Sequence, residues 1–198
     1  MSEDNIRELS NIDKNSIEAQ LAVYCSPVIA GLKESNLIIL TRQNAVHLIQ
    51  TMKKTHISVY PLCTLGNRVT MLVYHEDELK KYLDLPATRD FLATYNYDPN
   101  SDLKELLTMF KQRYKLYSKN RKEFPHEMGI FLGYPIEDVT GFVNNEGKNF
   151  LYCGYWKVYA NVEEKVKIFD SYDVARDEII KLLSSGVDII QIAQSFVA

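Results

Sequence analysis

Long apolar runs are absent from this sequence of 198 residues. A membrane-spanning helix needs about 18 or more consecutive apolar residues, and no stretch of the chain approaches that length. The chain begins Met1-Ser2-Glu3-Asp4, which lacks the basic start and the apolar core of a signal peptide. These absences predict a cytoplasmic protein with no membrane partner.

Cysteine is scarce in this chain. Its three cysteines, Cys25, Cys63 and Cys153, lie at wide spacing and form no Cys-x-x-Cys pair. An odd number in that arrangement is typical neither of a secreted disulfide framework nor of a zinc finger. We therefore expect free thiols in a reducing compartment.

An excess of positive charge is missing as well. The net charge is −3 and the isoelectric point is near 5.8, which argues against a dedicated nucleic-acid binder. The stretch from Lys104 to Lys122 is rich in basic residues with aromatic residues between them, and such a helix could follow a line of phosphates. A solvated helix whose apolar side packs inward is the commoner explanation, so nucleic acid is not expected as a partner.

What is present fits an ordinary folded domain. Hydrophobic residues make up 46% of the chain and charged residues 25%, as in globular proteins generally. The length predicts one domain over residues 1–198, with residues 1–5 frayed. A chain of this size buries roughly 70% of the surface that its unfolded form exposes. It therefore needs no disulfide or metal ion to fold.

The periodicity of apolar residues predicts the fold class. Helical spacing predicts helices within 5–24 and at 26–31, 43–53, 77–83, 87–95, 101–119, 162–183 and 188–196, with short helices opened by Pro125 and Pro135. Runs rich in β-formers predict strands at 37–40, 56–63, 68–74 and 150–159. Pro61 indicates an edge strand or a break, and Ser101 is expected to cap the long helix. The prediction is an α+β fold, in which several helices cover a small, mainly antiparallel sheet of about four strands.

Two residues could form a catalytic pair. Cys25 is predicted to lie beside the N-terminus of a helix opened by Pro27, where the helix dipole favours a thiolate. His126 follows Pro125 at a helix start, which favours a neutral imidazole. With Glu127 or Asp138 orienting the ring, Cys25 and His126 would resemble the nucleophile and base of a thiol hydrolase. The ordinary alternatives are a buried core cysteine and, for Glu127, a partner of the helix dipole.

Other residues could bind a ligand. The stretch Tyr155-Trp156-Lys157 lies in a segment dense in aromatic residues, which could stack a planar ligand or simply form core. Gly154 in the same segment would admit a ligand or another part of the chain closely. Glu137 and Asp138 follow Pro135 and are expected first as charges in a first helical turn and second as ligands.

No cofactor is specified by a motif. The stretch from Gly129 to Gly133 has the wrong spacing for a dinucleotide fingerprint, and no strand precedes it. Cys25, Cys153 and His126 are metal-competent by ligand type if they meet in space. The cofactor, the metal and the oligomeric state are left open by the sequence.

Three blocks of the sequence, 25–33, 124–139 and 153–159, resemble one bacterial family, the domain-of-unknown-function family numbered 3793, which is typical of anaerobic Gram-positive bacteria. The resemblance covers about residues 16–180. It implies a cytoplasmic setting and tilts slightly toward redox or metal metabolism, and it implies no particular activity. The blocks contain the candidate site residues Cys25, Lys33, His126, Glu127, Tyr134, Glu137, Asp138, Tyr155, Trp156 and Lys157.

Two functions remain as hypotheses. The favoured one is a binding or accessory protein that holds a small molecule, a metal ion or a redox protein in a groove lined by the aromatic segment and the His126 segment. The alternative is a thiol-dependent hydrolase or transferase that uses Cys25 as nucleophile and His126 as base. The clustering of aromatic residues and glycines without a complete catalytic set favours binding.

Overall fold

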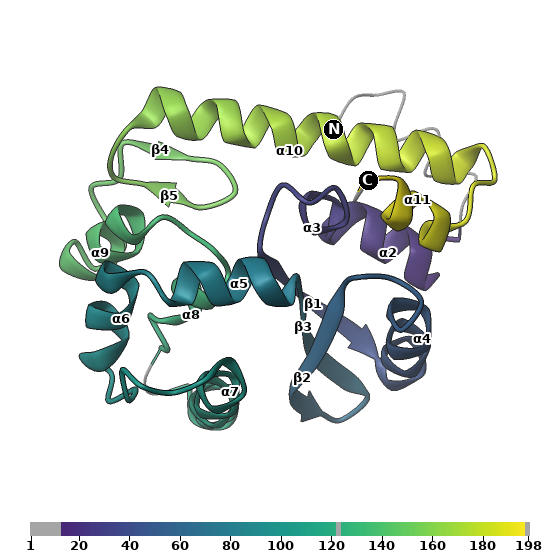
Figure 1. Ribbon diagram of the computed structural model, residues 1–198. Coiled ribbons are helices and arrows are strands. Elements are labelled where there is room, and N and C mark those ends of the chain that lie inside the picture. Colours follow the sequence, from purple (N-terminus) through teal and green to yellow (C-terminus); the bar gives the residue numbers. More distant parts are fainter. Residues whose placement is uncertain (1–12, 122–123, 197–198) are drawn as a thin grey trace. The chain divides into compact units, whose positions relative to one another are not determined.

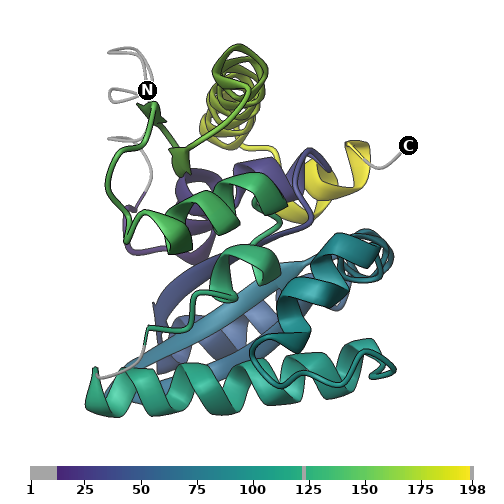
Figure 2. The ribbon, with the colours of Figure 1, turned by 90° about the vertical axis from the view of Figure 1, so that its left-hand side faces the viewer.

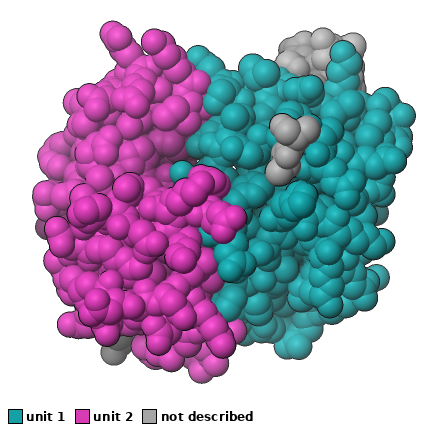
Figure 3. All heavy atoms as spheres, in the orientation of Figure 1, with its two compact units in different colours: residues 1–76, 170–198 teal, residues 77–169 magenta. Residues whose placement is uncertain are grey.

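The computed structural model describes residues 13–121 and 124–196, which form two compact units (Figure 3). Unit 1 comprises the described residues of 1–76 and 170–198, and unit 2 comprises those of 77–169. Together the described residues contain ten helices, a three-stranded antiparallel sheet and a two-stranded hairpin, which confirms the α+β class. The single domain over 1–198 stays a prediction, and the expected fraying of residues 1–5 lies outside the described residues.

Unit 1 contains the three-stranded sheet. Its strands are β1 (Ser35–Thr41), β2 (Ser58–Leu65) and β3 (Arg68–Tyr74), in the order β1-β3-β2. A two-residue turn joins β2 to β3, and Gly66 adopts a φ of 56° there, as tight hairpin turns require. The ladder between β2 and β3 shifts register between Pro61 and Cys63. The strand order makes β2 an edge strand. Pro61 therefore lies on an edge strand, as predicted, where its missing N–H is tolerated.

Helices cover the sheet of unit 1 and form its core with it. They are α2 (Ile17–Tyr24), α3 (Ser26–Ile29), α4 (Arg42–Met52), α11 (Ile189–Ser195) and the last part of α10 (Val162–Ser184), which continues from unit 2 (Figure 1). Ile38 and Leu40 of β1 are each 2% exposed and pack into one hydrophobic cluster with Leu48 and Ile179. The period-2 alternation of β1 turns Ile39 outward, where it is 51% exposed.

Unit 2 is mainly helical. It contains α5 (Glu76–Leu83, whose first residue falls in unit 1), α6 (Pro86–Ala93), α7 (Leu103–Asn120), α8 (Met128–Phe131), α9 (Ile136–Asn144), β4 (Tyr152–Cys153) and β5 (Lys157–Val158). Figure 2 shows α7 along one side of unit 2 and the β4–β5 hairpin on the other, with α8 and α9 between them. No helix within the described residues is long and apolar enough to cross a membrane.

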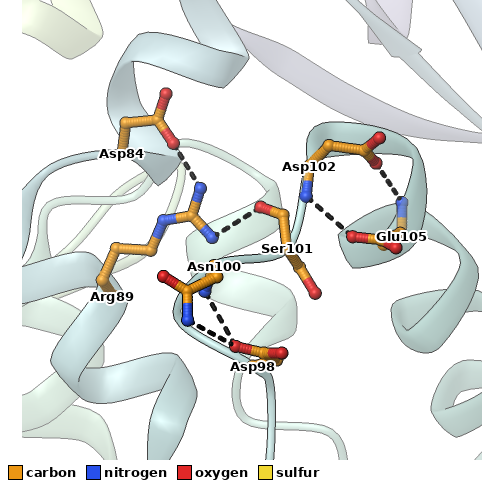
Figure 4. Close-up of polar contacts among 7 residues, drawn as sticks. All are labelled: Asp84, Arg89, Asp98, Asn100, Ser101, Asp102 and Glu105. Atoms are coloured by element: carbon orange, nitrogen blue, oxygen red, sulfur yellow. Dashed lines mark hydrogen bonds and ion pairs between the residues drawn. The ribbon is translucent and has the colours of Figure 1, made fainter.

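The loop before α7 corrects one predicted cap (Figure 4). Asp102, not Ser101, caps the helix: its carboxylate accepts a hydrogen bond from Glu105 N at 2.8 Å, and the Glu105 carboxylate accepts one from Asp102 N at 2.9 Å. This reciprocal arrangement is a capping box. The carbonyl of Ser101 instead accepts a hydrogen bond from Arg89, at 3.0 Å.

Three further predictions in unit 2 were wrong in detail. Pro125 opens no helix, because α8 begins only at Met128, and Pro135 is the N-cap of α9 rather than its first residue. The single strand predicted over 150–159 is a hairpin that turns at Gly154, whose N–H donates to Trp156 O at 3.1 Å. Gly154 is needed there because a Cβ atom would lie 2.4 Å from the ring of Phe169.

Candidate functional site

Unit 2 contains a mainly apolar cavity of about 210 Å³, which we call the aromatic pocket. Its walls come from the chain before α8, from α8 and α9, and from the β4–β5 hairpin. The lining residues are Phe124, His126, Met128, Gly129, Tyr134, Asp138, Val139, Phe142, Trp156 and Lys157. The pocket therefore brings together five of the candidate residues that the sequence indicates.

Two groups of aromatic rings border the pocket. Tyr134 and Trp156 stack with their ring centroids 5.0 Å apart. Phe124 lies 5.3 Å from the ring of His126, and Phe142 lies 5.9 Å from that same ring, again between centroids. Offset and tilted pairs of this kind hold each ring in one orientation. The pocket thus has stiff aromatic walls.

Gly129 allows these walls to approach one another. A Cβ atom at this position would lie 2.8 Å from Val139 Cγ2 and 3.4 Å from the ring of Tyr134. The contact with Val139 is shorter than an ordinary van der Waals distance, and Val139 lines the pocket. Any larger residue in place of Gly129 would therefore move a wall of the pocket.

His126 lines the pocket, and one atom of its ring is buried and unpaired. Its Nδ1 is buried and has no hydrogen-bond partner in the described part of the chain. Burial lowers the pKa of His126, against the upward pull of the Glu127 carboxylate, so the ring is neutral at neutral pH. A neutral imidazole has one donor and one acceptor nitrogen, and a buried atom of either kind left unpaired costs free energy.

Asp138 links α9 to the hairpin. Its Oδ2 accepts a hydrogen bond from Trp156 Nε1 at 2.7 Å, and its Oδ1 accepts one from Tyr159 N at 2.7 Å and a longer one from Ala160 N at 3.3 Å. The side chain is 2% exposed, so these bonds compensate the burial of its charge. Asp138 therefore orients Trp156 in the pocket, while both of its own oxygens are already occupied.

Lys157 places a cation at the pocket. Its Nζ donates to Gly147 O at 2.7 Å and lies 5.8 Å from the ring centroid of Phe142 and 4.8 Å from that of Phe150. No carboxylate pairs with it among the described residues. An ammonium has three donor hydrogens, so Lys157 can still bind an anion.

Glu127 lies outside the pocket lining and is committed to another partner. It is fully buried and forms an ion pair with Arg113 of α7, and its Oε1 also accepts a hydrogen bond from Tyr97 at 3.3 Å. The Glu127 charge and burial together raise the pKa of Tyr97, burial having the larger effect. The side chain makes no capping bond, so Glu127 stabilises unit 2 through α7 rather than through a helix dipole.

Glu137 and Tyr155 also lie outside the lining. Glu137, in the first turn of α9, pairs with the buried Lys165 at 2.9 Å. Burial alone would raise the pKa of Glu137, but the hydrogen bond and the charge of Lys165, together with a backbone hydrogen bond, outweigh burial, and the net shift of the pKa is downward. Tyr155 is 36% exposed and its ring lies 5.6 Å from that of Phe169, between centroids. As ligand-binding residues, both stay predictions.

Cys25 and Lys33 belong to unit 1, whereas every residue that lines the aromatic pocket belongs to unit 2. Cys25 is 0% exposed, and burial raises its pKa to about 12, although Lys33 acts in the opposite direction. The thiol is therefore protonated at neutral pH, and the thiolate expected at the start of α3 does not form because burial outweighs that one-turn helix. Cys25 lies in unit 1 and His126 lies in unit 2, so neither unit by itself contains the predicted pair. The catalytic role of the two residues stays a prediction.

A metal site is not found in the described residues. No group of three or more histidine, cysteine, aspartate or glutamate side chains is placed to hold an ion there. Cys25 lies in unit 1 and both Cys153 and His126 lie in unit 2, so neither unit by itself contains the metal-competent set. Cys63 is buried, and Cys153 is exposed on the hairpin.

Sequence reasoning missed Phe124, Met128, Val139 and Phe142 as pocket residues, and Arg113 as the partner of Glu127. Phe142 could have been found, because it lies four residues after Asp138 on α9 and residues at that spacing share a helix face. No local signal pairs Arg113 with Glu127, which lies 14 residues later in the chain.

Of the comparisons with known proteins, the comparison with family models gives a match and the other two do not. No curated protein and no solved structure matches the chain. The model of the family described as "Protein of unknown function (DUF3793)" matches residues 21–193, a span that includes both Cys25 and every residue lining the aromatic pocket. The chain therefore belongs to the DUF3793 family.

Proposed function

We propose that unit 2 binds a small planar aromatic acid in the aromatic pocket, and that the protein acts through this binding rather than through catalysis of its own. The observation that carries the proposal is a mainly apolar pocket with aromatic walls, whose lining also includes the imidazole of His126 and the ammonium group of Lys157. Ligand sites are typically apolar cavities with a few polar groups that fix orientation, and this pocket has that composition.

The size of the pocket limits the ligand. Drug-sized ligands occupy cavities of roughly 300–1,000 Å³, whereas a dry apolar cavity of about 150 Å³ accepts benzene. The aromatic pocket, at about 210 Å³, falls between these and suits one ring or two fused rings. Rigid aromatic walls favour a flat ligand, because a flat ring can stack against Tyr134 and Trp156 without displacing them.

The charged residues that line the pocket indicate the charge of the ligand. Lys157 has donor hydrogens to spare and no paired carboxylate, so it favours an anionic substituent. Asp138 also lines the pocket, but its oxygens already accept three hydrogen bonds, so it has little capacity for a cationic ligand. An oxygen of the ligand can accept a hydrogen bond from the neutral imidazole of His126, which has one donor nitrogen.

The test uses the tryptophan fluorescence of the protein, since the sequence contains one tryptophan and that residue, Trp156, lines the pocket. The probe is 4-nitrobenzoate, a flat carboxylate that quenches indole on contact, and its uncharged comparison is 4-nitrobenzyl alcohol. We expect saturable quenching by the acid at concentrations at least tenfold lower than by the alcohol. Equal, non-saturating quenching by both compounds would mean that the pocket takes no aromatic acid.

Variants assign the binding to the two polar groups. Lys157→Met and His126→Phe should each weaken binding of the acid about tenfold, since a lost charge-assisted or ordinary hydrogen bond costs about 1–3 kcal/mol. Lys157→Met should leave the weak binding of the alcohol unchanged. His47→Phe is the matched control, because His47 is an exposed residue of α4 in unit 1, and it should leave both affinities unchanged.

A further inference from the structure

The outer edge of β1 in unit 1 is open. In the sheet order β1-β3-β2, β1 pairs with β3 alone, from Ser35 opposite Tyr74 to Thr41 opposite Arg68. An antiparallel edge strand turns the N–H and C=O groups of every second residue away from its partner strand. Within the described residues no backbone group bonds to the outer side of residues 37–40. Such an edge is a template for another strand.

A groove of about 770 Å³ runs along this edge. One wall is residues 37–41 of β1, and the other is the side of α2 that carries Ala19, Gln20, Val23 and Tyr24. Ile39 and Tyr24 are 51% and 57% exposed, so the middle of the groove presents apolar surface. An edge strand beside a helix, with a groove between them, is the geometry in which an extended peptide joins a sheet.

Two asparagine side chains hold α2 beside the strand. Asn36, at the start of β1, donates from its amide to Tyr24 O at the end of α2. Asn44, at the start of α4, donates to Asn15 O just before α2, at 2.8 Å. Because these bonds lie at opposite ends of the groove, its width is set without a bound partner. A preformed groove costs less ordering on binding.

The groove is positively charged at one end. Its charged lining residues are Lys14 and Arg68, and no acidic residue is among the described residues that line it. Both cations lie toward the Thr41 end, because Arg68 is opposite Thr41 and Lys14 precedes the Asn15 carbonyl that Asn44 binds. Neither forms an ion pair with a described residue. Carboxylates are the complementary groups for this end.

We propose that unit 1 binds an extended segment of another protein along β1, as a fourth strand of the sheet, with acidic side chains of that segment at Lys14 and Arg68. Main-chain hydrogen bonds to the open edge give the affinity, and the cationic end sets the register and the preference for acidic sequences. This site involves no residue of the aromatic pocket and does not depend on its function.

The first test measures fluorescence anisotropy with the full chain and a labelled probe peptide as long as β1, which has 7 residues. The probe alternates valine and threonine and ends in two aspartates. We expect saturable binding that weakens at least tenfold when the aspartates are replaced by lysines. It should be lost when alternate backbone amides of the probe are methylated, because methylation removes the strand's hydrogen donors. Equal binding of all three peptides, or of none, would overturn the proposal.

Charge reversal gives the sharper test. The double variant Lys14→Glu with Arg68→Glu should exchange the preference, so that the lysine-ended peptide binds at least tenfold more tightly than the aspartate-ended one. Lys53→Glu, at an exposed position after α4 that does not line the groove, is the matched control and should keep the original preference. Circular dichroism of each variant should match the wild type, so that an unfolded protein is not taken for a lost site.

Two other occupants would overturn the proposal with distinct results. If a second copy of the chain fills the groove, sedimentation should show a dimer that dissociates on Arg68→Glu and excludes the probe. If the chain's own residues 1–12 fill it, the probe should bind only after those residues are removed. The proposal predicts probe binding by the full-length chain as a monomer.

Discussion

The interior of unit 1 is aliphatic, whereas unit 2 is built around aromatic rings and buried ions. Unit 1 packs residues such as Ile38, Leu48 and Met71, each at most 2% exposed, into one cluster. In unit 2, Phe110 stacks on Phe131 with centroids 4.3 Å apart, and Glu127 is buried against Arg113. Branched aliphatic side chains fill space in many orientations, but rings and ion pairs require particular ones.

This difference explains where each unit could bind a partner. The aliphatic core of unit 1 is closed, and its open feature is the backbone edge of β1, which suits another strand. In unit 2 the rings of Phe142 and Trp156 leave a cavity between oriented walls, which suits a flat small molecule. The same comparison predicts which substitutions each unit tolerates.

The largest expected effect on the free energy of unfolding comes from removing the buried ion pair of unit 2. Arg113→Met should lower the free energy of unfolding by about 3–5 kcal/mol, because it leaves Glu127 as an uncompensated buried charge. Urea unfolding followed by Trp156 fluorescence measures this in unit 2 directly. Lys81→Met, which removes the exposed partner of Glu78, is the control and should cost about 0–1 kcal/mol.

A second variant separates charge from packing at this site. Adding Glu127→Leu to Arg113→Met should restore most of the lost stability, since the uncompensated charge is then gone. If Arg113→Met alone destabilises no more than Lys81→Met does, the ionic interior assigned to unit 2 is wrong.

A smaller effect is expected at the turn of the hairpin. Gly154→Ala should destabilise unit 2 by about 1–3 kcal/mol, because its methyl group would overlap the ring of Phe169 and that ring would have to move. The measurement is again the urea midpoint by Trp156 fluorescence, since the Trp156 ring lies 4.5 Å from that of Phe169. When Phe169→Leu is also present, Gly154→Ala should lower the free energy of unfolding by less. An unchanged cost would mean that strain at Gly154 comes from its backbone.

The smallest expected effect is a pH dependence in unit 1. Burial lowers the pKa of Lys33 to about 8 in the folded protein, from 10.5. The unfolded state therefore binds more protons above pH 8, and stability should rise with pH there. The raised pKa of Cys25 opposes this above about pH 9, where the unfolded thiol ionises. The net gain between pH 7 and 9 should be about 1 kcal/mol.

The variant Lys33→Met tests that assignment. Urea unfolding at pH 7, 8 and 9, followed by circular dichroism, should show no rise in stability for Lys33→Met, which also should be at least as stable as the wild type at pH 7. The exposed Lys53→Met is the control and should keep the rise. An equal rise in all three proteins would show that Lys33 does not carry it.

Sequence patterns predicted the regular elements well and the site poorly, for physical reasons. The apolar run of β1 and the pairing of β2 with β3 are local features, so residue type and the short turn at Gly66 suffice to predict them. The hairpin at Gly154 depends on Phe169, 15 positions away in the chain, which no local pattern reports. The cap of α7 lies one residue later than predicted, because Asp102 stands three residues before Glu105 and forms a capping box with it.

The same reasoning applies to the candidate residues. His126, Asp138, Trp156 and Lys157 were indicated by residue type, Tyr134 by the family resemblance, and all five meet in the pocket. Glu127 and Glu137 were indicated by the same criterion, yet each is paired with a cation that the sequence does not identify as its partner. Residue type thus predicted which side chains carry polar chemistry, but only packing decides which of them remain able to meet a ligand.

The most direct test of the aromatic pocket is the NMR signal of the Trp156 indole N–H during titration with 4-nitrobenzoate. That N–H donates to Asp138 from inside the pocket, and with one tryptophan in the chain its signal is unambiguous. We predict one protected indole signal that shifts saturably with the acid, and that needs about tenfold higher concentrations of the acid for the same shift in Lys157→Met. An indole signal that does not respond in the wild-type protein would contradict the account.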